Sequence, residues 1–401
     1  MLPRMITGLD SPSPVSSALK DAMSKDGAVV VTDEYVAESA TLGDLPRLMA
    51  RRSSRASLIV LPEAGRGTLD WALDIARELR STQANTCTAI GGGSVLDSAK
   101  TAVASLEQPW LLDPAIWQSS SGRLPMVRER KRGETGLTLL AVPTLPGSAA
   151  QVAPRVTLAH TQGQSQKMAF GSGLVPDYAV VDSELWSDVG RSYVLVGLSE
   201  MLFRTLGPYL VTQTYSSEQE ADTLRIAQCI VDIGVQILRS QTGINSPVRS
   251  NIDRLSMESA RPERVLGWSP GIHPWWCVQN SLAAAVAVPK RSLTPRGFLA
   301  VLDGVPPASC ARLITSQEKI PDRSQGRSLI DDARYFLGEV SRSVGDVGAS
   351  VDDCMVDRVV VESLELWGPS IKAAGWGDRE AIGEFVRAAL GRRGLEPARA
   401  T

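Results

Sequence analysis

The chain has 401 residues, of which 43% are hydrophobic and 21% charged, with a formal net charge of −2. This length and hydrophobic content allow a large buried core and predict two domains. The nearly balanced charge argues against nucleic acid or a membrane surface as the main partner. The lack of an apolar run long enough to span a bilayer predicts a soluble, cytoplasmic protein.

Cysteine and histidine content narrows the chemistry. The cysteines are scattered, odd in number and form no CxxC pair, which predicts thiols in a reducing compartment without a nucleophilic role. They are Cys87, Cys229, Cys277, Cys310 and Cys354. Only two histidines, His160 and His273, are present, so a His-rich metal site is excluded by counting.

The first half of the chain alternates predicted strands with helices. A Ser- and Pro-rich start holds a short helical stretch at 14–25, and helical spacing recurs at 67–80 and from Ser94 to about residue 105. Buried apolar runs predict strands within 27–36, 57–62, 85–90, 137–151, 155–160 and 178–182. This order is typical of a parallel sheet with crossover helices.

Helical periodicity dominates the second half. The predicted helices cover residues 191–211, 217–240, 275–288, 295–303, 327–343, 354–374 and 378–393. The fold class is therefore an α/β, Rossmann-like domain over residues 1–182 followed by an all-α domain over residues 183–401. We expect the active site in a cleft between the two domains.

A glycine-rich turn is the most informative local feature. Residues 91–100 read GGGSVLDSAK and directly follow the predicted strand at 85–90. Glycines allow backbone N–H groups to approach a phosphate closely, and the helix that opens at Ser94 directs its positive end to the same place. The turn therefore predicts a nucleotide-binding site.

This turn and three further segments, given below, follow one another in the order found in the iron-containing alcohol dehydrogenase superfamily. The chain therefore resembles that superfamily, which includes glycerol dehydrogenases and dehydroquinate synthases. The resemblance covers most of residues 20–300 and implies a dehydroquinate synthase-like fold, with Gly91, Gly92, Gly93 and Ser94 at the pyrophosphate of NAD. It also implies that Asp97 and Lys100 mainly fix the local structure.

The other matching segments imply further cofactor contacts. Asp33, after the strand in VVVTDEYV, corresponds to the acidic residue that binds the adenosine ribose, which favours NAD over NADP. A helix-capping or turn role is the alternative for Asp33. Lys167 precedes the segment LVPDYAVVD and resembles the family lysine that faces the nicotinamide and the substrate. A solvated surface lysine is the alternative there.

The segment VPTLPGSAAQV, residues 142–152, resembles a nucleotide-wrapping loop of the family. Its expected contacts are Thr144, Leu145, Gly147 and Ser148. Ala149 and Ala150 replace small polar residues, so the loop offers fewer hydroxyl groups than the family pattern.

The four positions that resemble the family's metal ligands carry no suitable side chains. They are Ser199, Phe203, Leu282 and Arg296. We therefore expect no metal, which leaves either metal-independent hydride transfer or a non-catalytic relative.

Arg296 is the residue of greatest interest among these four. Thr294 and Pro295 read as an N-cap and first helical residue, which predicts Arg296 in the first turn of a helix. A guanidinium there can bind a carboxylate substrate or stabilise an alkoxide, with an exposed surface role as the alternative. Lys290 and Arg291 add positive charge nearby.

Alcohol oxidation without a metal requires a general base. His273, which lies close to Trp268, Trp275 and Trp276 in the sequence, is the first candidate, with a structural histidine as the alternative. Lys167 is the second candidate, and Tyr193 and Glu200 follow.

Three functions agree with these features. The first is a metal-independent, NAD-dependent dehydrogenase of a secondary alcohol, such as a β-hydroxy acid. The resemblance extends this to a daptide-type branch, in which a peptide C-terminal threonine is oxidised and then decarboxylated. The others are an inactive nucleotide-binding scaffold and a small-molecule ketone or aldehyde reductase. A homodimer and a partner protein that delivers the substrate are also expected.

Overall fold

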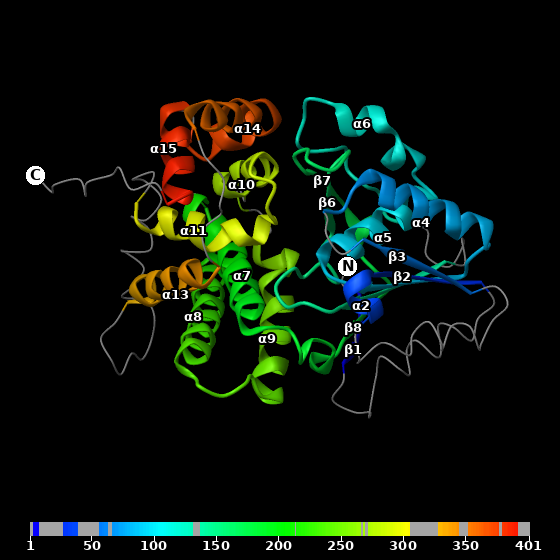
Figure 1. The fold of residues 1–401 in the computed structure, drawn as a ribbon, viewed down its shortest axis with the longest axis horizontal. Helices are drawn as coiled ribbons and strands as arrows, with labels where there is room; N and C mark the ends of the chain where they lie inside the picture. The colour runs from blue at the N-terminus through cyan, green and yellow to red at the C-terminus, as the bar shows by residue number, and fades with distance from the viewer. Residues whose placement is uncertain are drawn as a thin grey trace, which may run out of the picture. The chain divides into compact units, whose positions relative to one another are not determined.

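A computed structural model gives the fold of the chain (Figure 1). It describes residues 3–7, 27–38, 56–62, 66–130, 137–212, 214–265, 268, 272–304, 328–344, 352–376 and 379–391. The predicted helix at 14–25 and Cys310 lie outside these residues. The chain divides into two compact units: Met1–Gly190 with Ile244–Pro262, and Arg191–Gly243 with Glu263–Thr401.

The first unit is built on a six-stranded parallel sheet in the order β1-β8-β5-β4-β2-β3. The strands are β1 (Arg4–Thr7), β2 (Ala28–Asp33), β3 (Ser57–Leu61), β4 (Thr86–Gly91), β5 (Thr138–Pro143) and β8 (Tyr178–Val181). A separate antiparallel pair joins β6 (Arg155–Leu158) to β7 (Lys167–Phe170). The predicted parallel sheet is confirmed, while β1 and β7 are additions to the predicted strands.

Two long helices cover the sheet of the first unit (Figure 1). Helix α4 (Leu69–Ser81) and helix α5 (Gly93–Ser105) bury apolar faces in one large core cluster with the strands. Short helical segments complete the unit: α2 (Glu34–Glu38), η2 (Pro109–Leu112), α6 (Pro114–Gln118), η3 (Ser172–Leu174) and η4 (Ser183–Trp186). Residues 27–36 were expected to form a strand that runs into a turn. In the structure the strand ends at Asp33, and helix α2 begins at Glu34 in place of the turn.

Helix α9 (Ser246–Ser259) is grouped with the first unit although the predicted division assigned it to the helical domain. It contacts η4 through buried Trp186, whose indole N–H donates to both carboxylate oxygens of Asp253 at 3.1 and 3.3 Å. Arg249 adds an ion pair to Glu184 at 2.6 Å. These contacts attach a polar helix that offers few apolar residues of its own.

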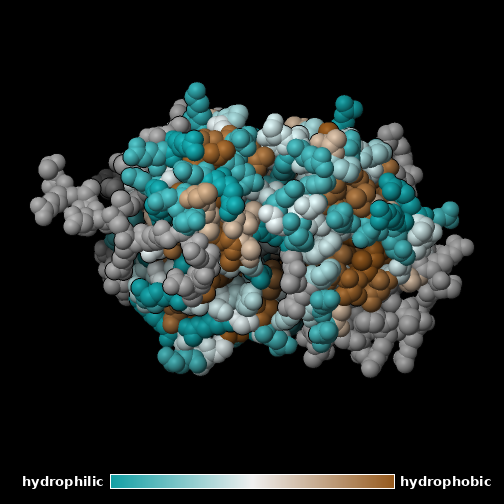
Figure 2. All heavy atoms as spheres, turned by 45° about the horizontal axis from the view of Figure 1, so that its top comes forward, coloured by the Kyte–Doolittle hydropathy of each residue, from teal (hydrophilic) through white to brown (hydrophobic). Residues whose placement is uncertain are grey.

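The second unit is all-helical. It comprises α7 (Arg191–Val211), α8 (Ser217–Arg239), η5 (Pro262–Val265), α10 (Pro274–Ala285), α11 (Lys290–Leu302), α13 (Leu329–Ser343), α14 (Asp353–Ala373) and α15 (Arg379–Ala389). Helix α7 is apolar and long enough to qualify as a membrane span, but 78% of its most apolar window is buried in the structure, as in the core helix of a globular domain. The visible surface is largely hydrophilic, with scattered hydrophobic patches (Figure 2).

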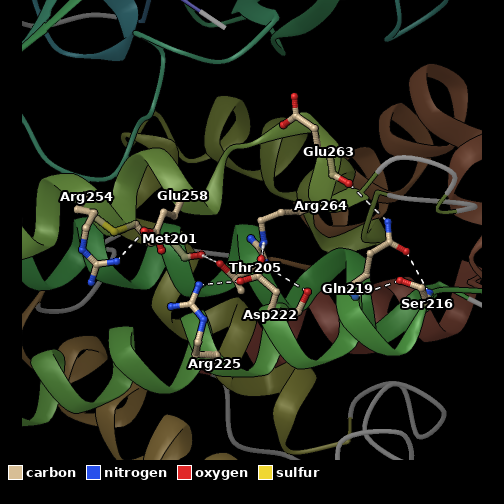
Figure 3. A network of polar contacts seen from close by, with 11 residues as sticks. Met201, Thr205, Ser216, Gln219, Asp222, Arg225, Arg254, Glu258, Glu263 and Arg264 are labelled. Atoms are coloured by element: carbon tan, nitrogen blue, oxygen red, sulfur yellow. Dashed lines mark hydrogen bonds and ion pairs between the residues drawn. The ribbon is translucent and has the colours of Figure 1, made fainter. Parts of the chain in front are cut away.

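A polar network attaches η5 to α8 inside this unit (Figure 3). Arg264 donates to the Asp222 carboxylate and to the Thr223 hydroxyl, both at 3.0 Å, and Arg225 also binds Asp222. These cations hold the pKa of Asp222 below its usual value although burial opposes them. The guanidinium of Arg264 therefore fixes the chain where it returns from α9.

Candidate functional site

Three neighbouring strands of the first unit end together at the carboxyl edge of the sheet. Gly91, the last residue of β4, pairs with Pro143 at the end of β5. On its other side β4 pairs with β2, which ends at Asp33. The loops that follow these strands are thus brought to one edge, where parallel α/β sheets bind their ligands.

The turn after β4 leads directly into α5. Gly92 is the N-cap residue of this helix, with φ −72° and ψ −179°, and it supplies no side-chain hydrogen bond to the first turn. The helix begins at Gly93, one residue before the predicted start. Amides at the start of a 13-residue helix that receive no cap from the N-cap residue can bind an anion such as a phosphate.

The neighbours of the glycines leave little space for a side chain, least of all at Gly91. A Cβ on Gly91 would lie 2.7 Å from a Val95 methyl group, and one on Gly93 would lie 3.2 Å from Cβ of Ser148. Leu145 stands 3.3 Å from the place of a Cβ on Gly92. The structure therefore brings the glycine turn and the loop after β5 together.

The loop at 144–148 is itself ordered by backbone contacts. The amide of buried Thr144 donates to the carbonyl of Gly91 at 3.2 Å, and Gly147 has a φ of 104° that favours glycine. Ser148 is exposed at the end of this loop. Four predicted cofactor residues of the loop thus lie at the turn or directly beside it.

Asp33 has a structural role at the same edge. Its Oδ1 accepts a hydrogen bond from the amide of Val36 at 2.9 Å, which caps the short helix α2. The half-buried carboxylate is therefore held in place at the end of β2. A fixed carboxylate at this position also suits the ribose contact predicted for it.

Asp97 and Lys100, both on α5, fix the local structure next to the glycine turn. Oδ2 of Asp97 accepts from the amide of Thr157 at 2.9 Å. The ammonium of Lys100, buried completely, donates to the carbonyls of Ala150, Ala153 and Arg155 at 3.1, 2.9 and 2.6 Å. Burial lowers the pKa of Lys100 to about 8, while Asp97 opposes this shift. Both residues attach the chain at 150–157 to α5.

Lys167 lies at the start of β7, and its ammonium donates to the carbonyl of Ser119 at the end of α6. Burial lowers the pKa of its side chain. The only described hydrogen bond of this ammonium thus goes to the carbonyl at the end of α6. A contact between Lys167 and the cofactor stays a prediction.

His273 precedes α10 in the second unit and is 1% exposed. Its Nδ1 accepts from the amide of Trp275 at 3.1 Å, so the imidazole caps the helix and carries its proton on Nε2. Phe203 and Trp376 pack edge-on against the ring at 5.8 and 5.2 Å. Burial lowers the pKa of His273 to about 3. We therefore propose a capping role in place of the predicted general base.

The expected start of the helix around Arg296 is wrong. Helix α11 begins at Lys290, so Pro295 lies inside it and Arg296 falls in the second turn. Thr294 is no N-cap, because it lies inside this helix, whose N-cap is Pro289, and its hydroxyl donates to the carboxylate of Glu200 on α7. The Thr-Pro pair resembles a helix start, but a contact with another helix uses the hydroxyl.

The residues at the family's metal positions do not fit a metal ion. The hydroxyl of Ser199 donates to the carbonyl of Leu195 at 3.0 Å within its own helix. Phe203 packs against Phe298, and Leu282 is completely buried. Among the described residues there is no group of three His, Cys, Asp or Glu side chains suited to a metal.

Residues 3–183 match the family described as iron-containing alcohol dehydrogenase. The match lies within the first unit and covers less than half of the chain. The predicted resemblance is therefore confirmed for these residues.

A phosphonoacetaldehyde reductase of Streptomyces viridochromogenes is 30% identical over 145 residues. The match covers 36% of this chain and spans about a third, 35%, of the reductase.

Solved structures confirm the predicted fold class along the whole chain. A 1,3-propanediol oxidoreductase has a TM-score of 0.72 at 14% identity and covers 97% of this chain and 98% of its own. A sulfoacetaldehyde reductase from Bifidobacterium kashiwanohense in complex with NAD+ has a TM-score of 0.72 at 13% identity and covers 97% of both chains. At these identities the similarity concerns the fold alone.

Sequence reasoning missed the side chains that α7, α10 and α11 bring together around Thr294. Glu200 was only a late candidate, and Gln279, whose amide donates to Thr294, was not considered. No local motif marks either residue, since they come from different helices. The one usable signal in the sequence was Glu200 itself, a single acidic residue in the apolar helix α7.

Proposed function

We propose that this chain is an NAD-dependent oxidoreductase that interconverts an alcohol and a carbonyl compound bearing an anionic group. The observation that carries the proposal is the glycine turn at the start of α5, where Gly92 leaves the first turn uncapped beside the loop at 144–148. NAD, when bound, supplies or accepts the hydride. The first unit provides its pyrophosphate contacts, and Asp33 binds the ribose and disfavours a 2′-phosphate.

The anionic substrate is supported by charge on α11. Lys290, Arg291 and Arg296 give this helix three cations and no acid. The phosphonoacetaldehyde and sulfoacetaldehyde reductases among the similar proteins are both named for aldehydes with an anionic group. Arg296 is proposed to bind that group through its guanidinium.

A β-hydroxy acid, including a peptide C-terminal threonine that decarboxylates after oxidation, is the finer form of this proposal. The carboxylate of a β-hydroxy acid, close to its hydroxyl group, would be the partner of Arg296 in that substrate. We also propose that turnover needs no resident metal, because the four side chains at the family's ligand positions are poor donors. A homodimer, substrate delivery by a partner protein and a cytoplasmic location stay predictions.

The test combines nucleotide binding with a substrate panel. Purified protein is heated with NADH or NADPH, and the panel then pairs NADH with phosphonoacetaldehyde, sulfoacetaldehyde and butanal, and NAD+ with 3-hydroxybutyrate and a threonine-ended peptide. We expect stabilisation by NADH above NADPH and turnover of anionic substrates above butanal. Arg296→Gln should raise KM for the anionic aldehyde by about tenfold and leave butanal unchanged.

Two results separate the alternatives. Stabilisation by NADH without turnover of any member indicates the nucleotide-binding scaffold. Equal turnover of butanal and the anionic aldehydes indicates a general aldehyde reductase and contradicts the role of Arg296.

A further inference from the structure

Three helices of the second unit are joined by a line of side-chain hydrogen bonds. The amide Nε2 of Gln279 on α10 donates to the hydroxyl of Thr294 on α11 and, at 2.7 Å, to the carbonyl of Lys290. The Thr294 hydroxyl in turn donates to Oε1 of Glu200 on α7. Since Gln279 and Thr294 are completely buried, this line holds one oxygen of the carboxylate in a fixed place.

The other end of the carboxylate is accessible. Glu200 is half-buried, and its Oε2 accepts no hydrogen bond from the residues that the structure describes. Glu200 is the single acid on α7, α10 and α11. The bases on these helices are Arg191, Arg204, Lys290, Arg291 and Arg296. An isolated carboxylate fixed on one side and accessible on the other has the properties of a proton acceptor.

A second atom near this line also lacks a partner. Oε1 of Gln279 is buried and receives no hydrogen bond within the described part of the chain. Its orientation is fixed, because Nε2 faces two oxygens and cannot be exchanged with Oε1. A buried acceptor without a donor points to a bound molecule that supplies an O–H or N–H group.

The other candidate bases are less suited to accept a proton. Nδ1 of His273 caps α10, and the ammonium of Lys167 binds the carbonyl of Ser119. The ring of Tyr193 lies under the guanidinium of Arg291, 4.8 Å from the ring centre. Nε2 of His273 has no described partner either, but it is buried and carries the ring proton, so it cannot accept one. Glu200 differs from these candidates in having a carboxylate that is fixed at one oxygen and accessible at the other.

We propose that Glu200 is the catalytic acid–base residue and that Thr294 and Gln279 are its positioning residues. This role rests on the proposed function. In the oxidative direction Oε2 of Glu200 accepts the O–H proton of the alcohol; NAD+, when bound, would take the hydride of the C–H bond as the C=O bond forms. In the reductive direction the carboxylic acid of Glu200 returns the proton to the carbonyl oxygen, and NADH would supply the hydride.

The test is steady-state kinetics on the full chain with the best substrate of the panel. Glu200→Gln keeps the size of the side chain and an acceptor for Thr294, so the melting temperature should not change. We expect kcat to fall by about 100-fold or more, with Kd for NADH within about twofold of wild type. Glu200→Asp keeps a carboxylate and should retain more activity than Glu200→Gln.

The positioning role has its own matched variants. Thr294→Val should lower kcat by about tenfold with little change in KM, and Thr294→Ser should restore it. Thr205→Val is the control, because it removes a buried hydroxyl from α7 that donates only to the carbonyl of Met201. It should leave kcat unchanged.

Three outcomes overturn the proposal in distinguishable ways. Wild-type protein without turnover of any substrate overturns the proposed function and this role together. If wild type turns the substrate over and kcat of Glu200→Gln lies within about tenfold of the wild-type value, the role of Glu200 alone is overturned. Equal effects of Thr294→Val and Thr205→Val overturn the positioning role.

Discussion

At the scale of single residues, the structure shows which charged groups maintain the fold and which are available for chemistry. Lys100 and Asp253 are buried and fully engaged in attaching one segment to another. The resemblance implied a structural role for Lys100, but the partners of both side chains could not be deduced from the sequence, because they lie far along the chain. Asp33 combines a local cap with a place at the sheet edge, and the sequence indicated both possibilities.

Asp253 makes the stability of the first unit depend on pH. Burial raises the pKa of its carboxyl from the ordinary value of 3.8 to about 7, although the hydrogen bond from Trp186 opposes this shift. The folded state therefore binds the proton more tightly, and this contribution to the free energy of unfolding is complete below pH 3.8 and lost as pH rises through 7.

The variant Asp253→Asn should remove that loss, since the amide oxygen still accepts from Trp186. At pH 8 it should be more stable than wild type by up to about 4 kcal/mol, and near pH 4 the difference should shrink. Urea unfolding at both pH values measures it. A constant difference between the two proteins at both pH values contradicts this account.

Lys100 should contribute strongly to stability. Lys100→Met leaves three buried carbonyls without their donor, which we expect to cost about 3 kcal/mol or more of unfolding free energy. Ser98→Ala on the same helix is the matched control, because the Ser98 hydroxyl is buried without a partner among the described residues. It should change stability by less than about 0.5 kcal/mol, and equal losses in both variants would contradict the role of Lys100.

At the scale of elements, helix ends and short strands were harder to predict than buried runs. β5 was predicted because continuous apolar residues mark strands buried on both faces. β1 and β7 have only four residues each and lack such runs. Helix α9 was missed because few of its residues are apolar, although Asn245 and Pro247 offered a start signal, the Asn245 side chain accepting from Val248.

The start of α11 shows why a local pattern can mislead. Thr-Pro is a frequent helix start, yet here Pro295 lies inside a helix that Pro289 precedes. The Thr294 hydroxyl is taken by Glu200, a partner 94 residues away in sequence. Tertiary contacts therefore decided an end that local preference assigned differently.

At the scale of the whole molecule, the order of strands and helices was sufficient for the fold class. The turn and loop of the proposed cofactor site could also be placed side by side, because both directly follow buried strands that share one sheet edge. It could not be predicted that residues 244–262 belong to the first unit, since this depends on contacts such as that of Trp186 with Asp253. The same holds for the line from Gln279 to Glu200.

Metal analysis tests the whole second unit. Protein purified without chelator should contain far less than one zinc or iron per chain, because the side chains at the family's ligand positions are a hydroxyl, two apolar groups and a guanidinium. Dialysis against EDTA should leave the melting temperature and the turnover of the best substrate unchanged. One tightly bound metal ion per chain would contradict this reading of the helices.

We predict that the glycine turn before α5 binds the pyrophosphate of NAD. Its most direct test is an equilibrium titration with NADH, followed by nicotinamide fluorescence, on wild type, Gly92→Ala and Gly92→Asp. An Asp at this N-cap supplies the missing cap and adds a negative charge, so it should keep or slightly raise stability and weaken NADH binding by about 100-fold or more. Gly92→Ala, which needs only a small shift of Leu145, should weaken binding far less. Equal NADH affinity of wild type and Gly92→Asp would contradict the claim.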